Sequence, residues 1–358
     1  MKPIVVANVL LGLAALVACA KPNVLDAQCV TAPAACTEFI RVGSGSARIR
    51  VHRSHPLDTP NDSITRALIM VHGADRAILW EFRSVLAGAY LAGSLQNTLV
   101  IAPRFAANQP GGCADSLSTN ELNWECDLQR VDWRLGGNAT NDSLTSAFAA
   151  MDAIVLSLTQ GSKFPNLRRI VVAGHSAGGQ FVTLYAMANQ VHDRLKVELS
   201  YVVANSAGYA YLDDRRPAKQ WLEASARIDP SDTTQITFTQ YIGVSACPAY
   251  GKWPFGLASK PPYAARLSDA QLVRQAAQRP VTYLLSQLDV SIPGPGGYYG
   301  SCAAMAQGST RLSRGLAFAS YMAQAHRAPH KSIVVDGCAH DSRCVYTSDE
   351  ALRVLFRR

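Results

Sequence analysis

The feature of this sequence that most restricts its fold is a tight turn between a strand and a helix. A run of β-branched residues at 169–173 leads into Gly-His-Ser-Ala-Gly-Gly at 174–179, and residues 180–188 have a helical pattern. So short a turn holds its central residue in a strained backbone conformation. Glycines must flank it, because a Cβ there would collide with the neighbouring strand or helix. The sequence therefore predicts that Ser176 is presented on a sharp strand–turn–helix corner.

Short apolar runs alternate with longer helical patterns along most of the chain. Continuous apolar runs, as opposed to alternating ones, predict strands that are buried on both faces, as in a parallel sheet. We expect such strands at 67–71, 98–102, 169–173, 199–204, 281–285 and 332–335, and helices at about 77–93, 143–158, 178–190, 310–325 and 348–356. This alternation indicates an α/β fold with a doubly wound, mostly parallel sheet.

The first 40 residues indicate export. Lys2 and the apolar stretch 4–17 fit a signal peptide, because the stretch is too short to span a membrane. Leu-Val-Ala-Cys at 16–19 resembles a bacterial lipobox, in which Cys19 would be lipidated and attach the protein to a membrane. Ala-Cys-Ala at 18–20 also fits ordinary signal cleavage. We expect a cell-envelope lipoprotein or a secreted protein.

The remaining chain divides into a leader and one large domain. Residues 20–40 contain prolines and cysteines and are interpreted as a tethered leader, and residues 41–358 as the α/β domain. Within that domain, residues 210–280 are rich in Pro, Tyr and Trp and contain no strong apolar strand. This insertion after the fourth strand is either a candidate lid over the carboxyl edge of the sheet or a set of irregular surface loops.

The cysteines also favour export. The chain has nine, and either processing route leaves eight, an even number that is typical of disulfides in exported proteins. Eight cysteines allow about 105 connectivities, so the sequence does not determine the pairs. Proximity suggests Cys29–Cys36, Cys113–Cys126, Cys247–Cys302 and Cys338–Cys344. No pair has zinc-ribbon spacing, so a metal site is not indicated.

From about residue 45 to its end, the chain resembles the α/β-hydrolase superfamily. The resemblance lies in the Gly-His-Ser-Ala-Gly-Gly turn, the order of the elements and the acidic and histidine residues considered next. This form of the turn is found in secreted esterases, depolymerases and lipases, so it does not distinguish among them. The resemblance implies that Ser176 is the nucleophile of a serine carboxylic ester hydrolase that works through an acyl-enzyme.

Such a serine needs a histidine base, which comes last in the chain order of this fold. His340 follows the last predicted strand and is the expected base. His326 and His330 precede that strand, and we expect them on the surface. Cys338 and Cys344 bracket His340, and a disulfide between them would hold the catalytic loop.

The orienting acid should follow the strand before the histidine strand. Asp289 lies just after the predicted strand 281–285 and is the expected acid. Asp213 and Asp214, after the fourth strand, are the alternative, because some members of the fold take the acid from that position.

An oxyanion hole should complete the site. One donor should be the backbone N–H of Ala177, directly after the nucleophile. The other should come from the loop after the first predicted strand, where Gly73 lets the chain turn and Ala74 or Asp75 is the expected donor.

Other classes of function fit less well. The net charge of +8 is dispersed, so nucleic-acid binding is not expected. No Gly-rich phosphate loop, H-E-x-x-H or calcium-loop pattern implies a cofactor or a metal. The expected partner is an ester substrate that is small, lipid-like or polymeric. Two alternatives remain open: a serine peptidase or amidase of the same fold, and a surface lipoprotein whose hydrolase fold only binds.

Overall fold

A computed structural model describes residues 29, 35–110, 112–126, 132–225, 236–294 and 298–356. The export signal predicted for residues 1–19, including Cys19, and most of the predicted leader lie outside these residues. Among the helices of the described ranges, none is both long and apolar enough to cross a membrane.

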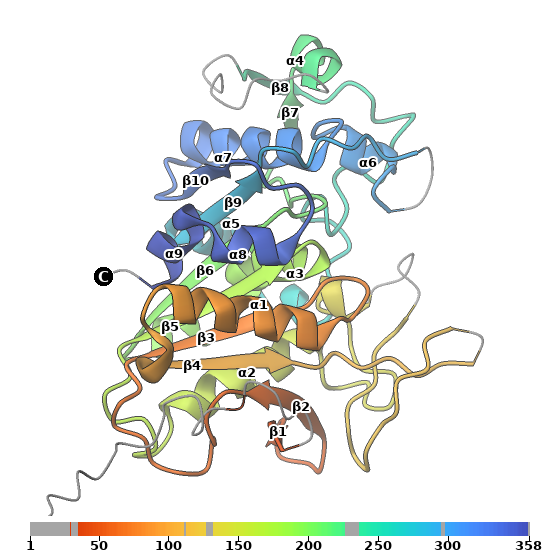
Figure 1. The fold of residues 1–358 in the computed structure, drawn as a ribbon. Coiled ribbons are helices and arrows are strands. Elements are labelled where there is room, and N and C mark those ends of the chain that lie inside the picture. Colours follow the sequence, from red (N-terminus) through yellow and green to blue (C-terminus); the bar gives the residue numbers. More distant parts are fainter. Residues whose placement is uncertain are drawn as a thin grey trace, which may run out of the picture.

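One eight-stranded sheet forms the centre of the molecule (Figure 1). Its strands are β1 (Thr37–Arg41), β2 (Arg48–Arg53), β3 (Arg66–Val71), β4 (Thr98–Pro103), β5 (Arg169–His175), β6 (Glu198–Ala204), β9 (Val281–Ser286) and β10 (Lys331–Val335). The spatial order is β1-β2-β4-β3-β5-β6-β9-β10. The six strands β4, β3, β5, β6, β9 and β10 pair in parallel, whereas β2 runs antiparallel to both β1 and β4. The predicted mostly parallel sheet is therefore confirmed, with two antiparallel strands at one edge.

The six strands expected from apolar runs correspond to β3, β4, β5, β6, β9 and β10. Strands β1 and β2 were not predicted, because their sequences, TEFIR and RIRVHR, mix charged and apolar residues and are only half buried. Strand β1 begins at Thr37, inside the range assigned to the leader, so the fold starts earlier than the predicted boundary at residue 41.

Helices cover both faces of the sheet (Figure 1). They are α1 (Ile78–Leu91), α2 (Ala147–Thr159), α3 (Ala177–Ala188), α4 (Lys219–Ala224), α5 (Asp269–Gln278), α6 (Cys302–Met305), α7 (Arg311–His326), α8 (Ser342–Thr347) and α9 (Asp349–Leu355). Leu68 and Met70 of β3 pack with α1 and α9 on one face, and Ile69 and Val71 pack with α2, α3 and α7 on the other. Alternate side chains of one strand thus enter two cores, as a doubly wound sheet requires.

The parallel strands end at a common edge, where four loops meet. The loops after β3, β5, β9 and β10 contain, in that order, the predicted oxyanion residues, Ser176, Asp289 and His340. Ligands of open α/β sheets bind outside the carboxyl ends of the strands, so this edge is where a site is expected.

The segment 210–280 packs against the rest of the domain. It contains β7 (Arg215–Pro217), which pairs antiparallel with β8 (Phe238–Gln240), together with α4 and α5, and α5 contacts α3. The guanidinium of Arg216 is buried between the rings of Tyr211 and Tyr250. It donates hydrogen bonds to the backbone oxygens of Asp213, Tyr250 and Phe255, and so ties one part of the segment to another.

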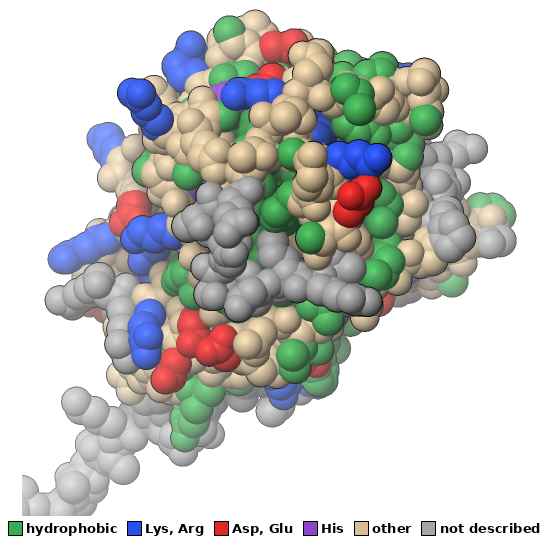
Figure 2. Space-filling view, turned by 90° about the horizontal axis from the view of Figure 1, so that it is seen from above, with side chains coloured by type: hydrophobic (Ala, Val, Ile, Leu, Met, Phe, Trp, Pro, Cys, Tyr) green, Lys and Arg blue, Asp and Glu red, His purple; other side chains and the backbone are tan. Residues whose placement is uncertain are grey.

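Basic side chains are dispersed over the surface. In the view of Figure 2, Lys and Arg lie singly or in small groups with acidic side chains among them, and they form no continuous stripe on this face.

The role of Arg216 can be tested against its neighbour. Arg216→Ala leaves buried carbonyl oxygens without their donor, and we expect the free energy of unfolding to fall by about 2–4 kcal/mol. Arg215→Ala removes only a half-exposed pair with Asp213, and we expect a loss below about 1 kcal/mol. Urea unfolding measures both variants. Equal losses would contradict the role given to Arg216.

Candidate active site

Ser176 lies at the corner between β5 and α3. Its backbone has φ 57° and ψ −117°, a strained conformation for a residue with a side chain. Its N–H donates to the oxygen of Ala204 at 3.0 Å, and its own oxygen accepts from the N–H of Gln180 at 3.1 Å. The strand–turn–helix corner predicted from the sequence is therefore present.

The glycines around Ser176 are required by close packing. A Cβ on Gly174 would lie 2.3 Å from the oxygen of Gly178, and a Cβ on Gly178 would lie 2.2 Å from the oxygen of Val71 in β3. Real Cβ atoms do not come so close to a backbone oxygen, so either substitution would force the backbone apart. The turn therefore lies directly against the end of β3.

Three predicted side chains are brought together by hydrogen bonds. Nε2 of His340 lies 3.0 Å from Oγ of Ser176, and Nδ1 of His340 lies 2.6 Å from Oδ2 of Asp289. The Asp289 side chain is only 2% exposed, whereas that of His340 is 31% exposed. A hydroxyl, an imidazole and a buried carboxylate thus form one hydrogen-bonded line, and the imidazole is its most exposed member.

Asp289 is held by the first turn of α7. Its Oδ1 lies 3.4 Å from Nη1 of Arg311, and its backbone oxygen accepts from the N–H of Leu312. The positive charge of Arg311 and the N-terminus of a helix both stabilise a carboxylate. Arg311 was not predicted, because nothing in its local sequence indicates a contact with a residue 22 positions earlier.

The alternative acids have other partners. Asp213 accepts hydrogen bonds from the side chain of Arg215, and Asp214 accepts one from the hydroxyl of Tyr250. Of these acids and Asp289, only Asp289 has a hydrogen bond to the imidazole of His340 among the described residues.

His326 and His330 do not lie on the surface as expected. Both are half buried, His326 against the hydroxyl of Tyr321 and His330 against the hydroxyl of Tyr283. The bond of His326 lies within α7, whereas His330 also contacts the backbone oxygen of Ala276, and neither histidine lines the pocket at Ser176.

A second histidine lies next to His340. The ring centroids of His175 and His340 are 4.5 Å apart, and Nε2 of His175 lies 3.2 Å from the side-chain nitrogen of Asn205. Burial, together with the charges of His340 and Arg311, holds the pKa of His175 well below its usual range. His175 is therefore neutral and adds no positive charge beside His340.

His72 organises the loop after β3. Nε2 of His72 accepts the N–H of Phe105 at 3.2 Å, so Nδ1 carries the proton and donates it to the oxygen of Gly73 at 2.8 Å. Burial lowers the pKa of His72 to about 4, which keeps the ring neutral. The direction of the Gly73 carbonyl is thereby set.

The predicted oxyanion residues lie in a turn that begins at Gly73. The N–H of Arg76 donates to the oxygen of Gly73 at 3.1 Å, which makes Ala74 and Asp75 the central residues of the turn. The N–H groups of Ala74 and Asp75 do not form the hydrogen bond that closes this turn. Both residues line the same pocket as Ser176, as the predicted hole requires.

The pocket beside Ser176 has a volume of about 270 Å³. Its lining comes from the loop after β3, the start of α1 and the residues that follow His340: Gly73, Ala74, Asp75, Trp80, Glu81, His175, Ser176, His340, Asp341 and Ser342. None of these belongs to the segment 210–280, so the two alternatives for that segment, a lid or a set of surface loops, both remain predictions.

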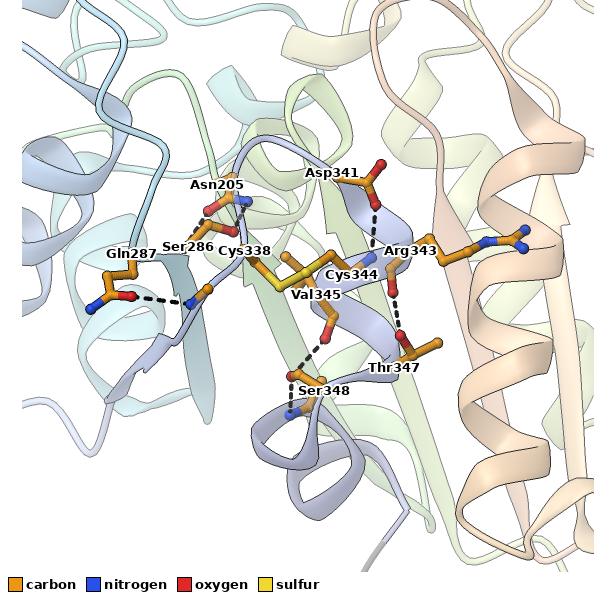
Figure 3. Close-up of a disulfide and its surroundings, with 12 residues drawn as sticks. Asn205, Ser286, Gln287, Cys338, Asp341, Arg343, Cys344, Val345, Thr347 and Ser348 are labelled. Atoms are coloured by element: carbon orange, nitrogen blue, oxygen red, sulfur yellow. Dashed lines mark hydrogen bonds between the residues drawn. A yellow bond between two sulfur atoms is a disulfide. The ribbon is translucent and has the colours of Figure 1, made fainter.

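All four disulfides suggested by proximity are confirmed: Cys29–Cys36, Cys113–Cys126, Cys247–Cys302 and Cys338–Cys344. The last of these closes the loop that carries His340 (Figure 3). The oxygen of Cys338 accepts from Leu288 at 2.8 Å, and Asp341 caps α8 by accepting from the N–H of Cys344 at 2.7 Å. The His340 loop is thus held at both ends.

Glu81, in the first turn of α1, is a buried carboxyl group at the pocket. Burial raises its pKa to about 8, the charges of Asp75 and Asp341 add to this rise, and a hydrogen bond from Ser342 opposes it. Glu81 was not predicted, because a single acidic residue in an amphipathic helix gives no sequence signal.

No group of three or more His, Cys, Asp or Glu side chains within the described ranges is arranged to hold a metal ion.

Comparison with known proteins agrees with the fold. Residues 68–354 match the profile of a family described as the alpha/beta hydrolase family. A poly(aspartic acid) hydrolase-1 from Sphingomonas sp. KT-1 is 19% identical, with a TM-score of 0.55 over 89% of this chain and 97% of that chain. A poly(3-hydroxybutyrate) depolymerase from Bordetella parapertussis is 16% identical, with a TM-score of 0.54 over 87% and 85%. No curated protein matches the chain significantly. At these identities the two structures show a shared fold.

The raised pKa of Glu81 predicts a pH-dependent stability. Between about pH 4.5 and 8 the folded protein keeps a proton that the unfolded chain releases, so Glu81 makes the free energy of unfolding fall as pH rises through this range. Glu81→Gln removes this dependence. We therefore compare the free energy of unfolding of the variant with that of wild type at each pH. The variant minus wild-type difference should increase by about 2 kcal/mol or more from pH 5 to 8, since each unit of pKa difference corresponds to about 1.4 kcal/mol. Urea unfolding at several pH values measures it, and a constant difference would contradict the prediction.

Proposed function

The chain belongs to the alpha/beta hydrolase family, and on this premise we propose that it is an exported serine hydrolase that cleaves carboxylic esters through an acyl-enzyme. The observation that carries the proposal is the unbroken hydrogen-bonded line from Ser176 through His340 to Asp289. Ser176 is the nucleophile, His340 the general base and Asp289 the residue that orients the imidazole.

The first half of the reaction forms the acyl-enzyme. Nε2 of His340 takes the proton of Ser176 as Oγ attacks the carbonyl carbon of the ester. The N–H of Ala177 and that of Ala74 or Asp75 donate to the oxygen that becomes negative; one such donor is typically worth about 3–4 kcal/mol. The bond from carbon to the alcohol oxygen then breaks, and the alcohol leaves with the proton from His340.

The second half releases the acid. Water gives a proton to His340 and attacks the acyl carbon, the bond to Oγ breaks, and Ser176 regains its proton. In both halves Asp289 accepts the Nδ1–H of His340 and stabilises the charged imidazolium. Arg311 holds the other oxygen of Asp289, and this leaves Oδ2 directed at the ring.

The size of the substrate and the type of bond that is cleaved are proposed only in general terms. One structural neighbour is a depolymerase of a polyester and the other a hydrolase of poly(aspartic acid), whose backbone is made of amides. The same triad chemistry serves both bonds, so a peptidase or amidase is the second candidate. A panel that pairs each ester with its amide separates the two.

Export is supported by the disulfides. Four disulfides are typical of a protein that folds in an oxidising compartment. We propose attachment to the membrane through a lipid on Cys19, with secretion after plain signal cleavage as the alternative. Mass spectrometry of the mature N-terminus distinguishes a lipidated cysteine from a free one.

Removal of the nucleophile tests the proposal. We expect Ser176→Ala to lower the hydrolysis of a short-chain chromogenic ester by roughly 1,000-fold or more and to abolish labelling by a fluorophosphonate probe. Ser94→Ala, at the far end of α1, is the matched control, and its rate should equal that of wild type. Full activity of the Ser176 variant would refute the assignment, and an unlabelled wild type would favour a protein that only binds.

The disulfide around the base gives a second test. Cys338→Ser/Cys344→Ser frees the loop of His340, and we expect kcat to fall by roughly 10-fold because small displacements of a catalytic group slow reactions strongly. Cys113→Ser/Cys126→Ser also removes a disulfide but none of the pocket lining, and its kcat should be unchanged. Equal kcat values for the two variants would show that the Cys338–Cys344 bond only stabilises the fold.

A further inference from the structure

The pocket beside Ser176 is acidic. Three carboxyl side chains line it: Asp75 from the loop after β3, Glu81 from α1 and Asp341 from the residue after His340. No Lys or Arg is among its lining residues in the described part of the chain. Asp75 and Asp341 are close enough to Glu81 for their charges to raise its pKa, so the three groups share one electrostatic environment.

These carboxylates have no cationic partner among the described residues. Oδ1 of Asp75 accepts the N–H of Ala77 at 3.2 Å, and Oδ1 of Asp341 accepts the N–H of Cys344, but neither forms an ion pair. The cations nearby are otherwise engaged. Arg76 pairs with Asp115, and the guanidinium of Arg343 lies 4.3 Å from the ring centroid of Trp80.

Glu81 supplies an independent sign of a missing ligand. Its side chain is only 4% exposed, and its Oε2 is buried without a hydrogen-bond partner. A buried oxygen in this state destabilises the protein unless a ligand compensates for the missing partner. Because Glu81 lines the pocket, a cation bound there would favour the ionised form of Glu81 and lower its raised pKa.

The wall of this pocket also contains an aromatic side chain. Trp80 lines the same pocket and is 46% exposed, an unusual position for a large apolar side chain. Arg343 lies over one face of this ring, and the part of the ring that stays exposed can attract a further cation, including a quaternary ammonium group that cannot donate hydrogen bonds.

We propose that this pocket binds a cationic group on the alcohol half of the ester substrate, next to the bond that is cleaved. The alcohol half is indicated because the leaving oxygen must take its proton from Nε2 of His340 and therefore lies on the His340 side of Ser176. Asp341 follows His340 directly and contacts the same space as Glu81. The inference rests on the proposed ester hydrolysis and names the substrate class: esters of amino alcohols, with polyanions excluded by repulsion.

The test compares three esters that differ in whether they carry a positive charge and in which half of the molecule carries it. Butyrylcholine carries a quaternary ammonium in its alcohol half, 3,3-dimethylbutyl butyrate is its neutral carbon analogue, and ethyl 4-(trimethylammonio)butyrate carries the charge in the acyl half. We expect kcat/KM for butyrylcholine to exceed that for the neutral analogue by about 10-fold or more at low ionic strength. The ratio should fall in 0.5 M salt, because screening weakens the attraction.

Two variants connect the preference to the pocket. Glu81→Gln keeps the shape of the side chain, and Asp341→Asn keeps an N-cap for α8. Each should lower the ratio of choline ester to neutral ester, and the double variant should bring it to about 1. Asp349→Asn removes an exposed carboxylate of α9 outside the pocket and should leave the ratio as in wild type.

The outcomes separate the two proposals. If wild type cleaves the neutral ester as well as the choline ester, or prefers the charge on the acyl half, the inference is wrong and ester hydrolysis stands. If the ratio is high but the pocket variants leave it unchanged, the inference is wrong as well. If wild type cleaves none of these esters or any short-chain ester, the proposed function is wrong and the inference falls with it.

Discussion

The close approach of the turn at Ser176 to the ends of β3 and β6 is the constraint on which the site depends. At Gly178 and Gly179 there is no room for a side chain, because a Cβ would lie 2.2 Å from the oxygen of Val71 and 2.5 Å from that of Ala204. This contact brings the start of α3 beside the loop that leaves β3. Ala74 and Asp75 of the turn after β3 therefore line the same pocket as Ser176.

The other two members of the hydrogen-bonded line are held by unrelated means. Asp289 is buried and tied to α7 through Arg311 and Leu312, so its carboxylate has little freedom. His340 lies on a more exposed loop that a disulfide and the cap of α8 hold at its two ends (Figure 3). In the proposed mechanism, a fixed acid and a tethered base suit a ring that exchanges protons with substrate and water while it keeps one hydrogen bond constant.

How much the sequence could predict follows from the kind of signal that each feature leaves. Strands buried on both faces leave continuous apolar runs, so β3 to β10 of the main sheet were found, whereas β1 and β2 mix charged and apolar residues. That Ser176, Asp289 and His340 come together could be predicted because chain order and strand ends restrict where such residues lie. Arg311 and Glu81 act through contacts between distant segments, such as that of Glu81 with Ser342, and no local pattern encodes such contacts. The predicted signal peptide lies outside the described residues, so it remains a prediction.

The most direct test of this account is a crystal structure of the protein after reaction with a fluorophosphonate. We predict phosphorus bonded to Oγ of Ser176, with the phosphonyl oxygen about 3 Å from the N–H of Ala177 and from that of Ala74 or Asp75, and with Nδ1 of His340 still on Asp289. An adduct on another residue, or a phosphonyl oxygen turned away from both N–H groups, would contradict it.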